Sequence, residues 1–94
     1  MTSSIWKYPL TPGKSQTVSM PSGATPLSVG VAQGEMCLWA AVTTEAPRVQ
    51  RTINVLGTGW DWQGHPPGKF IGTVVFGKTL LGDCVWHVFD AGPY

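Results

Sequence analysis

Charge is scarce in this chain of 94 residues. Asp, Glu, Lys and Arg make up only 12% of it and the formal net charge is +1, whereas soluble domains usually contain roughly 25% charged residues. Either the surface is unusually uncharged, or another subunit covers part of it. The six Lys and Arg residues are scattered, and only Arg48 and Arg51 lie close together. A protein that binds nucleic-acid backbones needs clustered cations to displace counterions, so we do not expect DNA as the primary ligand.

Long apolar runs and secretion signals are also missing. No run approaches the roughly 18 to 20 residues that span a membrane, and Met1–Lys7 lacks the charged start and apolar core of a secretory signal. The two cysteines, Cys37 and Cys84, lie in apolar stretches without a CxxC spacing or a nearby pair of histidines. They predict small buried side chains and no metal site. We therefore expect a cytoplasmic, reduced protein with no membrane association, no metal and no cofactor.

Groups for acid–base or nucleophilic catalysis are few, with 5 acids and 2 histidines. Most of the acids fall where turns or strand ends are expected. His87 shares a face with Val85 and Phe89, which is typical of a core or edge histidine with its hydrogen bonds satisfied. No pair of carboxylates and no nucleophile–base pair has the spacing of a known chemistry. We expect no enzymatic activity.

Glycine and proline, by contrast, are frequent. Twelve glycines and eight prolines divide the chain into short runs that are typical of all-β proteins. No window has a helical period, and only Lys78–Leu81 could form one helical turn. The runs that predict strands are Ile5–Leu10, Gln16–Met20, Leu27–Ala32, Met36–Val42, Arg48–Leu56, Lys69–Phe76 and Cys84–Phe89. The prediction is a single domain over residues 1–94, an all-β fold of six to seven short antiparallel strands in a compact sandwich or partly open barrel.

Two runs carry more specific predictions. Gln33–Gly34 is a tight turn that joins Leu27–Ala32 and Met36–Val42 into a β-hairpin. Met36–Val42 is apolar on both faces, so we place it in the centre of a sheet.

Gly72–Thr79 matches the GxxxxGK[ST] pattern of a phosphate-binding loop. That chemistry needs four loop residues whose amides surround phosphate, followed by a helix that starts at the lysine. Here the four residues are Thr-Val-Val-Phe, which is strand sequence, and another strand follows soon after. We interpret the match as fortuitous. Gly57–Gly59 is likewise no dinucleotide motif, because no helix follows it.

The loop Gly57–Gly68 is the strongest candidate for a contact surface. It holds Trp60, Trp62 and His65, and long loops in small domains are often functional. Two interpretations are open: both tryptophans cover the open end of a sheet, or they form an aromatic platform for a planar ligand or a partner protein. Arg51 stands among apolar residues on its strand, where an arginine usually pairs with a carboxylate or binds an anion.

A resemblance rests on six segments in a constant order. They are Ile5–Leu10, Met20–Ala24, Cys37–Ala40, Val55–Gly59, Phe70–Thr73 and Trp86–Phe89. They resemble a family of small proteins, encoded largely by bacteriophages and prophages, that carries no established activity. That family usually continues Gly-Thr-Gly with a histidine and prolines, whereas here Trp60-Asp61-Trp62 comes first, which indicates a ligand preference of its own.

The resemblance implies a phage accessory protein, and small phage proteins often disarm host immunity. Our leading hypothesis is a non-enzymatic homo-oligomer that sequesters a nucleotide-derived immune signal. The residues expected to bind it are Trp60, Trp62, Trp86, His65, Arg51, Lys69, Gly57 and Gly59, with the tryptophans stacking on a base and the cations or backbone amides holding phosphate. The alternatives are an inhibitor that binds a host defence protein, as anti-CRISPR proteins do, and a minor component of the virion or its assembly.

Overall fold

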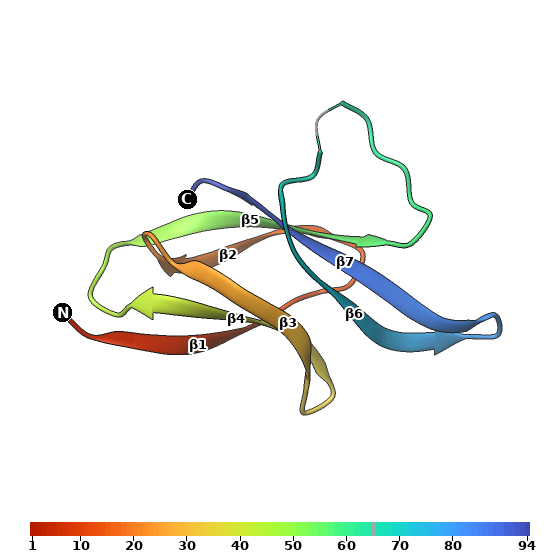
Figure 1. The fold of residues 1–94 in the computed structure, drawn as a ribbon, viewed down its shortest axis with the longest axis horizontal. Helices are drawn as coiled ribbons and strands as arrows, with labels where there is room; N and C mark the ends of the chain where they lie inside the picture. Colours follow the sequence, from red (N-terminus) through yellow and green to blue (C-terminus); the bar gives the residue numbers. More distant parts are fainter. Residues whose placement is uncertain (65) are drawn as a thin grey trace.

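Short alternating runs separated by glycine and proline form seven strands in the computed structural model, which describes residues 1–64 and 66–94 (Figure 1). The strands are β1 (Ser3–Pro9), β2 (Ser15–Pro21), β3 (Thr25–Ala32), β4 (Glu35–Thr43), β5 (Arg48–Gly57), β6 (Lys69–Thr79) and β7 (Gly82–Gly92). Each predicted strand is present, and its ends differ from the prediction by a few residues. The described residues contain no helix, and thus none that could cross a membrane.

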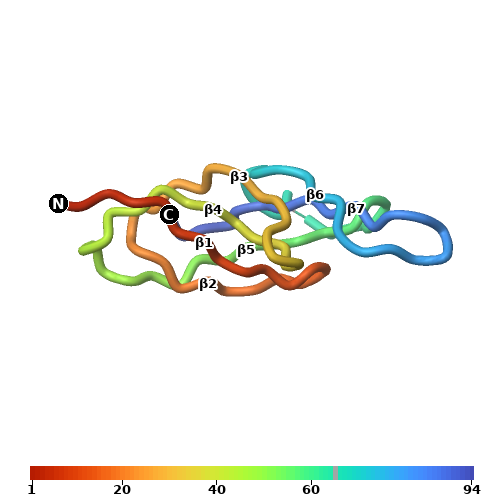
Figure 2. Tube along the Cα trace, turned by 90° about the horizontal axis from the view of Figure 1, so that it is seen from below, coloured from red at the N-terminus to blue at the C-terminus, as the bar shows by residue number. Residues whose placement is uncertain are grey.

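The strands form two antiparallel sheets that lie face to face. One sheet has the order β1-β4-β3 and the other β2-β5-β7-β6. The result is a thin sandwich with principal extents of 48 × 34 × 15 Å (Figure 2). The sheets do not close into a barrel, so the sandwich form of the prediction is confirmed.

The core lies between the sheets and takes one face of most strands. Because successive side chains of a strand point to opposite faces, alternate residues of β5 are buried, as are several residues of β4 and β7. The best buried apolar residues are Met20, Met36, Leu38, Ala40, Ile53, Val55 and Val88. β4 lies between β1 and β3, which confirms the central position predicted from its apolar faces. Cys37 in β4 is fully buried as predicted, whereas Cys84 is only half-buried, near the tip of the β6–β7 hairpin.

The β3–β4 hairpin is also confirmed. Ala32 pairs with Glu35, and the two residues between them have positive φ angles, 53° at Gln33 and 78° at Gly34. Two positive φ values define the type I′ turn, whose twist matches that of the flanking strands.

The segment that matches the phosphate-loop pattern lies within β6, so it offers no loop of amides and no helix. The segment Lys78–Leu81, which could have formed one helical turn, forms none. Lys78 and Thr79 are the last residues of β6, paired with Asp83 and Gly82, and Leu80 and Leu81 form the turn into β7. Four residues cannot offset the cost of nucleating a helix, whereas the β7 ladder gives their backbone groups partners.

Candidate binding site

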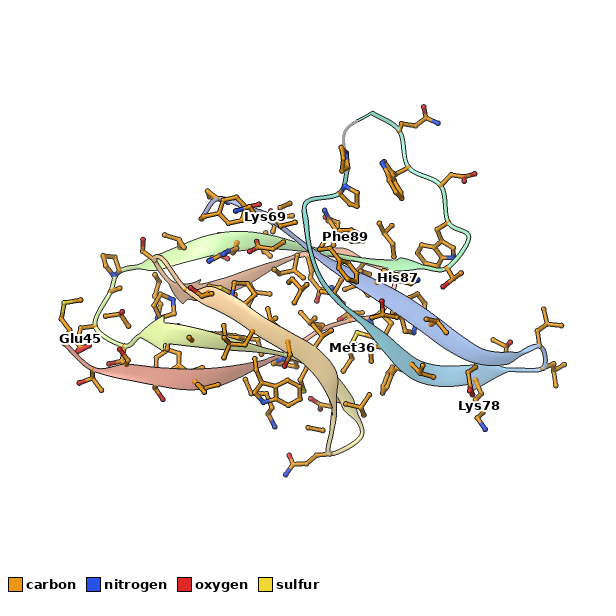
Figure 3. All side chains as sticks on the ribbon, in the orientation of Figure 1. Met36, Glu45, Lys69, Lys78, His87 and Phe89 are labelled. Carbon is orange, nitrogen blue, oxygen red and sulfur yellow. The ribbon has the colours of Figure 1, made fainter. Side chains whose placement is uncertain are left out.

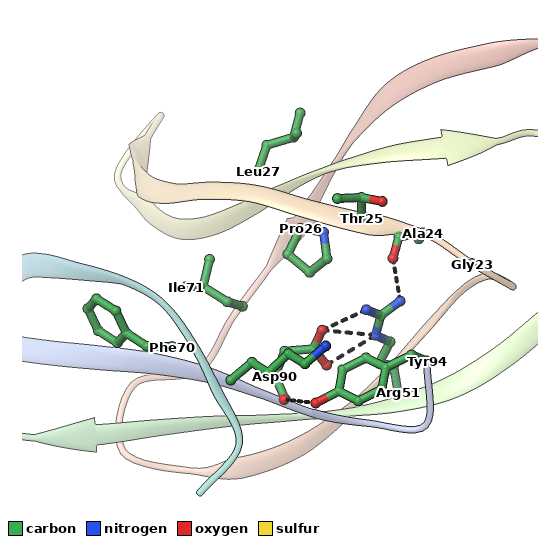
Figure 4. Close-up of a pocket in the computed structure, with 11 residues that line it drawn as sticks. Gly23, Ala24, Thr25, Pro26, Leu27, Arg51, Phe70, Ile71, Asp90 and Tyr94 are labelled. Atoms are coloured by element: carbon green, nitrogen blue, oxygen red, sulfur yellow. Dashed lines mark hydrogen bonds and ion pairs between the residues drawn. The ribbon is translucent and has the colours of Figure 1, made fainter.

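Arg51 projects from β5 into the space between the sheets. Its side chain is 3% exposed and forms an ion pair with Asp90 of β7, which is 4% exposed. Arg51 Nη2 donates to Asp90 Oδ2 at 2.6 Å and Nε donates to Oδ1 at 3.1 Å, while Nη1 donates to the Ala24 carbonyl at 2.5 Å (Figure 4). A buried charge persists only when it is paired and hydrogen-bonded. Arg51 was expected to pair with a carboxylate or to bind an anion, and the structure contains the pair with a carboxylate.

Tyr94 covers this ion pair from the C-terminal side. Its hydroxyl donates to the Asp90 carbonyl at 2.8 Å, and the Arg51 guanidinium carbon lies 5.1 Å from the centre of its ring. The Gly92 amide donates to Asp90 Oδ1 at 3.1 Å, so the end of β7 is held by the same carboxylate as Arg51. Arg51 and Asp90 thus form a neutral, rigid base beneath an aromatic ring.

A hollow of about 550 Å³ opens beside this ring. Its volume lies within the range of small-molecule sites, about 300 to 1,000 Å³. Besides Arg51, Asp90 and Tyr94, its lining consists of Gly23, Ala24, Thr25, Pro26, Leu27, Lys69, Phe70 and Ile71. Leu27 and Phe70 are exposed large apolar side chains, so the hollow has apolar walls that face solvent.

Lys69 supplies the accessible cation of the hollow. Its ammonium lies 4.3 Å from the centre of the Tyr94 ring, a cation–π arrangement. No carboxylate of the described residues lies within ion-pairing distance of it. Gly68 places Lys69 there: it has a φ of +132°, and a Cβ atom on it would lie 2.5 Å from the Asp90 carbonyl oxygen. Only glycine allows the chain to approach β7 this closely.

Three register shifts of the sheets meet around the hollow. Leu27 is an extra residue between Pro26 and Ser28 in β3, and Ile71 is an extra residue between Phe70 and Gly72 in β6. Both line the hollow. The third shift, between Thr52 and Ile53 of β5, leaves Ala91 unmatched beside Asp90. Bulges of this kind redirect side chains and are common beside functional sites.

The hollow brings a cation together with aromatic and aliphatic side chains. Among the described residues, its lining presents the Lys69 ammonium, two aromatic rings and aliphatic side chains, and the side-chain carboxylate of Asp90 is engaged by Arg51. Such a set fits a ligand that combines an anionic group with a planar or apolar part. In residues 1–64 and 66–94, no three His, Cys, Asp or Glu side chains lie together so as to hold a metal ion.

Trp60 and Trp86 do not line this hollow and lie together elsewhere on the molecule. Trp60 packs edge-on against Trp86, with ring centres 5.5 Å apart and planes at 90°, and it also lies over Gly57 and Gly13. Trp86 Nε1 donates to the Phe76 carbonyl at 2.8 Å. These rings cover the end of the second sheet beside a smaller hollow of about 340 Å³. Arg51 and Gly57 are six positions apart on β5, about 20 Å at 3.3 Å per residue.

The rest of the loop connects these two places. Trp62 is 52% exposed, and Gly59, with a φ of +86°, lies in the turn after β5. Near the far end, Asn54 Nδ2 donates to the Pro67 carbonyl at 2.6 Å, which ties the loop to β5. The candidate residue His65 lies outside the described residues.

His87 has partners for both ring nitrogens, as predicted. Nε2 lies 2.7 Å from Thr58 Oγ1 and Nδ1 lies 3.1 Å from Thr73 Oγ1. Figure 3 shows His87 and Phe89 following one another along β7. They alternate with the buried Val88 and Asp90, so they lie on the face of the sheet that is turned away from the core.

Five of the predicted residues thus form two groups, whereas Gly59 and Trp62 line neither hollow. Lys69 and Arg51 lie at the larger hollow, and Gly57, Trp60 and Trp86 lie at the smaller one. Sequence reasoning missed Tyr94, Phe70 and Asp90. For Asp90 a signal existed, because it continues the buried alternation of Trp86 and Val88 and is the acid that an arginine facing the core requires. For Tyr94 and Phe70 the sequence contains no such signal.

A family model described as "Domain of unknown function (DUF7352)" matches residues 1–93. No curated protein and no solved structure gives a significant match. Because the family model covers nearly the whole chain, this protein belongs to the DUF7352 family.

Proposed function

We propose that this protein is a non-enzymatic binding protein that captures a small nucleotide-derived ligand in the hollow beside Tyr94. The observation that carries the proposal is the Lys69 ammonium, which lies 4.3 Å from the Tyr94 ring at the mouth of an open hollow. An ammonium binds phosphate as a point charge, and an aromatic side chain stacks on any base. The ligand's phosphate contacts Lys69, and its base lies against Phe70 or Tyr94.

The biological setting is part of the same proposal. The resemblance to phage-encoded proteins supports a counter-defence role, in which the protein lowers the free concentration of a host immune signal. Sequestration needs affinity and no turnover. The hollow fits this requirement, because its carboxylate is held by Arg51 and its cation sits on a rigid base.

Isothermal titration calorimetry against cyclic dinucleotides and ADP-ribose derivatives tests the proposal. We expect micromolar or tighter binding of at least one compound. Lys69→Ala should weaken it by about tenfold or more, the usual effect of losing a charged hydrogen bond. The matched control is Lys7→Ala, which removes an exposed lysine of β1 that does not line the hollow. Absence of heat across the panel, with the protein shown to be folded, would contradict the proposal.

A second candidate function has its own observation. Trp62 is half-exposed in the loop after β5, and tryptophan is one of the residue types enriched among the residues that contribute most to protein–protein binding. An inhibitor of a host defence protein would use this loop. This second function predicts a stable complex with a partner protein that Trp62→Ala disrupts and Lys69→Ala leaves intact. For the small ligand we expect the reverse, with Lys69→Ala weakening binding.

A further inference from the structure

The β6–β7 hairpin extends beyond the rest of the sandwich. β6 and β7 pair as far as Thr79 and Gly82, whereas β5 pairs with β7 only as far as Trp86. Figures 1 and 2 show the hairpin projecting from one end of the molecule. Its end is therefore a two-stranded ribbon with open backbone edges, an arrangement that favours pairing with another chain.

Two leucines form the tip of this ribbon. Leu80 is 107% exposed and Leu81 is 99% exposed, as much as in an extended peptide. Turns are usually built from Gly, Asn, Asp, Ser and Pro, each for a backbone reason. Here Gly82, with a φ of +117°, satisfies the backbone requirement. Turn geometry thus does not require the leucines, and their exposure indicates a partner that covers them.

The base of the same hairpin borders a second hollow, of about 370 Å³, with polar and apolar lining. Its lining is Pro9, Leu10, Thr11, Gly34, Glu35, Met36 and Phe76. Phe76 and Leu80 are four positions apart, or about 13 Å along a strand. If two hairpins lie side by side in opposite directions, each tip reaches the hollow at the base of the other. A two-fold symmetry axis between the copies makes both contacts equivalent, so that each tip meets the hollow of the other copy.

The charges near the tip and the hollow are complementary. Lys78 lies beside the tip (Figure 3), and its only ion-pair partner among the described residues is Asp83, at 3.9 Å with both side chains exposed. Such a pair contributes little, so Lys78 is free to approach another carboxylate. Glu35 at the hollow has no ion-pair partner in the described part of the chain. In the two-fold arrangement described above, Lys78 of each copy would lie near Glu35 of the other.

We propose that the β6–β7 hairpin is a dimerisation element, and that Leu80 and Leu81 of each copy fill the hollow at the base of the other copy's hairpin. A second copy fits better than a lipid surface, because an anionic membrane attracts clusters of cations and this tip carries one lysine and one aspartate. The dimer would explain the low share of charged residues. It does not depend on the nucleotide ligand.

The test is the oligomeric state of the full chain, measured by sedimentation velocity over the micromolar range. We expect a dimer. The double variant Leu80→Ser/Leu81→Asn, which introduces common turn residues, should raise the dimer Kd by about tenfold or more. The matched control is Ile5→Thr, which changes an exposed apolar residue of β1 away from the hairpin and should leave the dimer intact.

A charge exchange tests the specific geometry. Lys78→Glu and Glu35→Lys should each weaken the dimer, and the two changes combined should restore it, because the pair is re-formed across the interface with its signs reversed. A wild-type protein that is monomeric throughout, or a dimer unaffected by the leucine changes, would overturn the proposal. Binding to lipid vesicles that is lost with the leucines, without dimerisation, would also overturn it.

Discussion

Arg51 and Asp90 join the two central strands of the larger sheet through a buried, bidentate ion pair. The closest atoms, Arg51 Nη2 and Asp90 Oδ2, are 2.6 Å apart. The pair lies where the register between β5 and β7 shifts at Thr52. It therefore fixes the end of β7 that carries Tyr94, and through Tyr94 it shapes the hollow that holds Lys69.

The first prediction concerns this ion pair. Arg51→Met removes the cation and leaves Asp90 buried without a counter-charge. Breaking a buried pair in this way costs about 3–5 kcal/mol, so the free energy of unfolding should fall by an amount of this order. Chemical denaturation followed by circular dichroism measures it.

The control is the double variant Arg51→Met/Asp90→Asn, in which no charge remains buried. We expect it to recover a large part of the lost stability, since the dominant cost of the single change is the unpaired carboxylate. Equal stability of the single and double variants would show that Asp90 reaches solvent or another cation.

Arg51 also shows how far the sequence could predict the site. Its position among apolar residues indicated a carboxylate or an anion, and the structure contains the carboxylate. The partner, however, lies 39 residues away. Local sequence does not encode which strands become neighbours, and here β7 lies between β5 and β6. For the same reason the sequence could not show that Lys69 and the tryptophans, which were assigned to one binding site, lie at two different hollows.

The strands themselves could be predicted from the sequence, because strand formation depends on local patterns. β5 was predicted over Arg48–Leu56 and is present over Arg48–Gly57, since its alternation of apolar and polar residues is regular. The bulges at Leu27 and Ile71 had no such signal. They arise where the twist of a sheet and close packing force an extra residue out of register, and these irregular positions line the hollow.

The second prediction concerns Gly68. In Gly68→Ala the Cβ atom would lie 2.5 Å from the Asp90 carbonyl oxygen and 2.8 Å from the Ala91 nitrogen, both backbone atoms that cannot move freely. The positive φ adds strain of about 1–3 kcal/mol. Stability should fall, and under the proposed function the displaced Lys69 should bind a nucleotide less tightly.

Gly59→Ala is the matched control, because Gly59 also has a positive φ, +86°, but no atom within 4 Å of the added Cβ. It should show the backbone strain alone. A loss of stability equal to that of Gly68→Ala would mean that the approach to Asp90 is not close.

The third prediction concerns Glu45, whose pKa lies below its ordinary value of 4.5. The main cause is the Thr44 hydroxyl, which donates to Oε2 at 2.8 Å, followed by the Thr2 amide, which donates to Oε1 at 2.6 Å. Because the folded pKa is lowered, the ionised carboxylate stabilises the fold above the unfolded pKa, and this contribution is lost as the pH falls through the folded pKa. Glu45→Gln should therefore reduce stability at pH 7 and have no such effect in strong acid.

An NMR titration of the Glu45 carboxyl carbon checks the shift directly. Thr44→Val removes the largest cause and should raise the pKa of Glu45 toward 4.5. A titration curve that is the same in both proteins would assign the shift to Thr2 instead.

The fourth prediction concerns Tyr8, whose buried hydroxyl has no hydrogen-bond partner among the described residues. Burial raises the pKa of Tyr8 above its ordinary value of 10.0, and the charge of Arg48 opposes this. An unsatisfied polar group costs about 1–3 kcal/mol, so Tyr8→Phe should stabilise the protein at pH 7. Since the folded pKa is raised, the native state of the wild type loses stability as the pH rises above 10, and the advantage of Tyr8→Phe should widen there.

Tyr94→Phe provides the opposite case, because the Tyr94 hydroxyl donates to the Asp90 carbonyl at 2.8 Å. Losing a satisfied hydrogen bond should destabilise the protein by about 1 kcal/mol. Thermal unfolding of both variants therefore separates a hydroxyl that costs stability from one that contributes it. If Tyr8→Phe were also destabilising, its hydroxyl would have to bind a partner, and an ordered water between β1 and the core would be the group to look for.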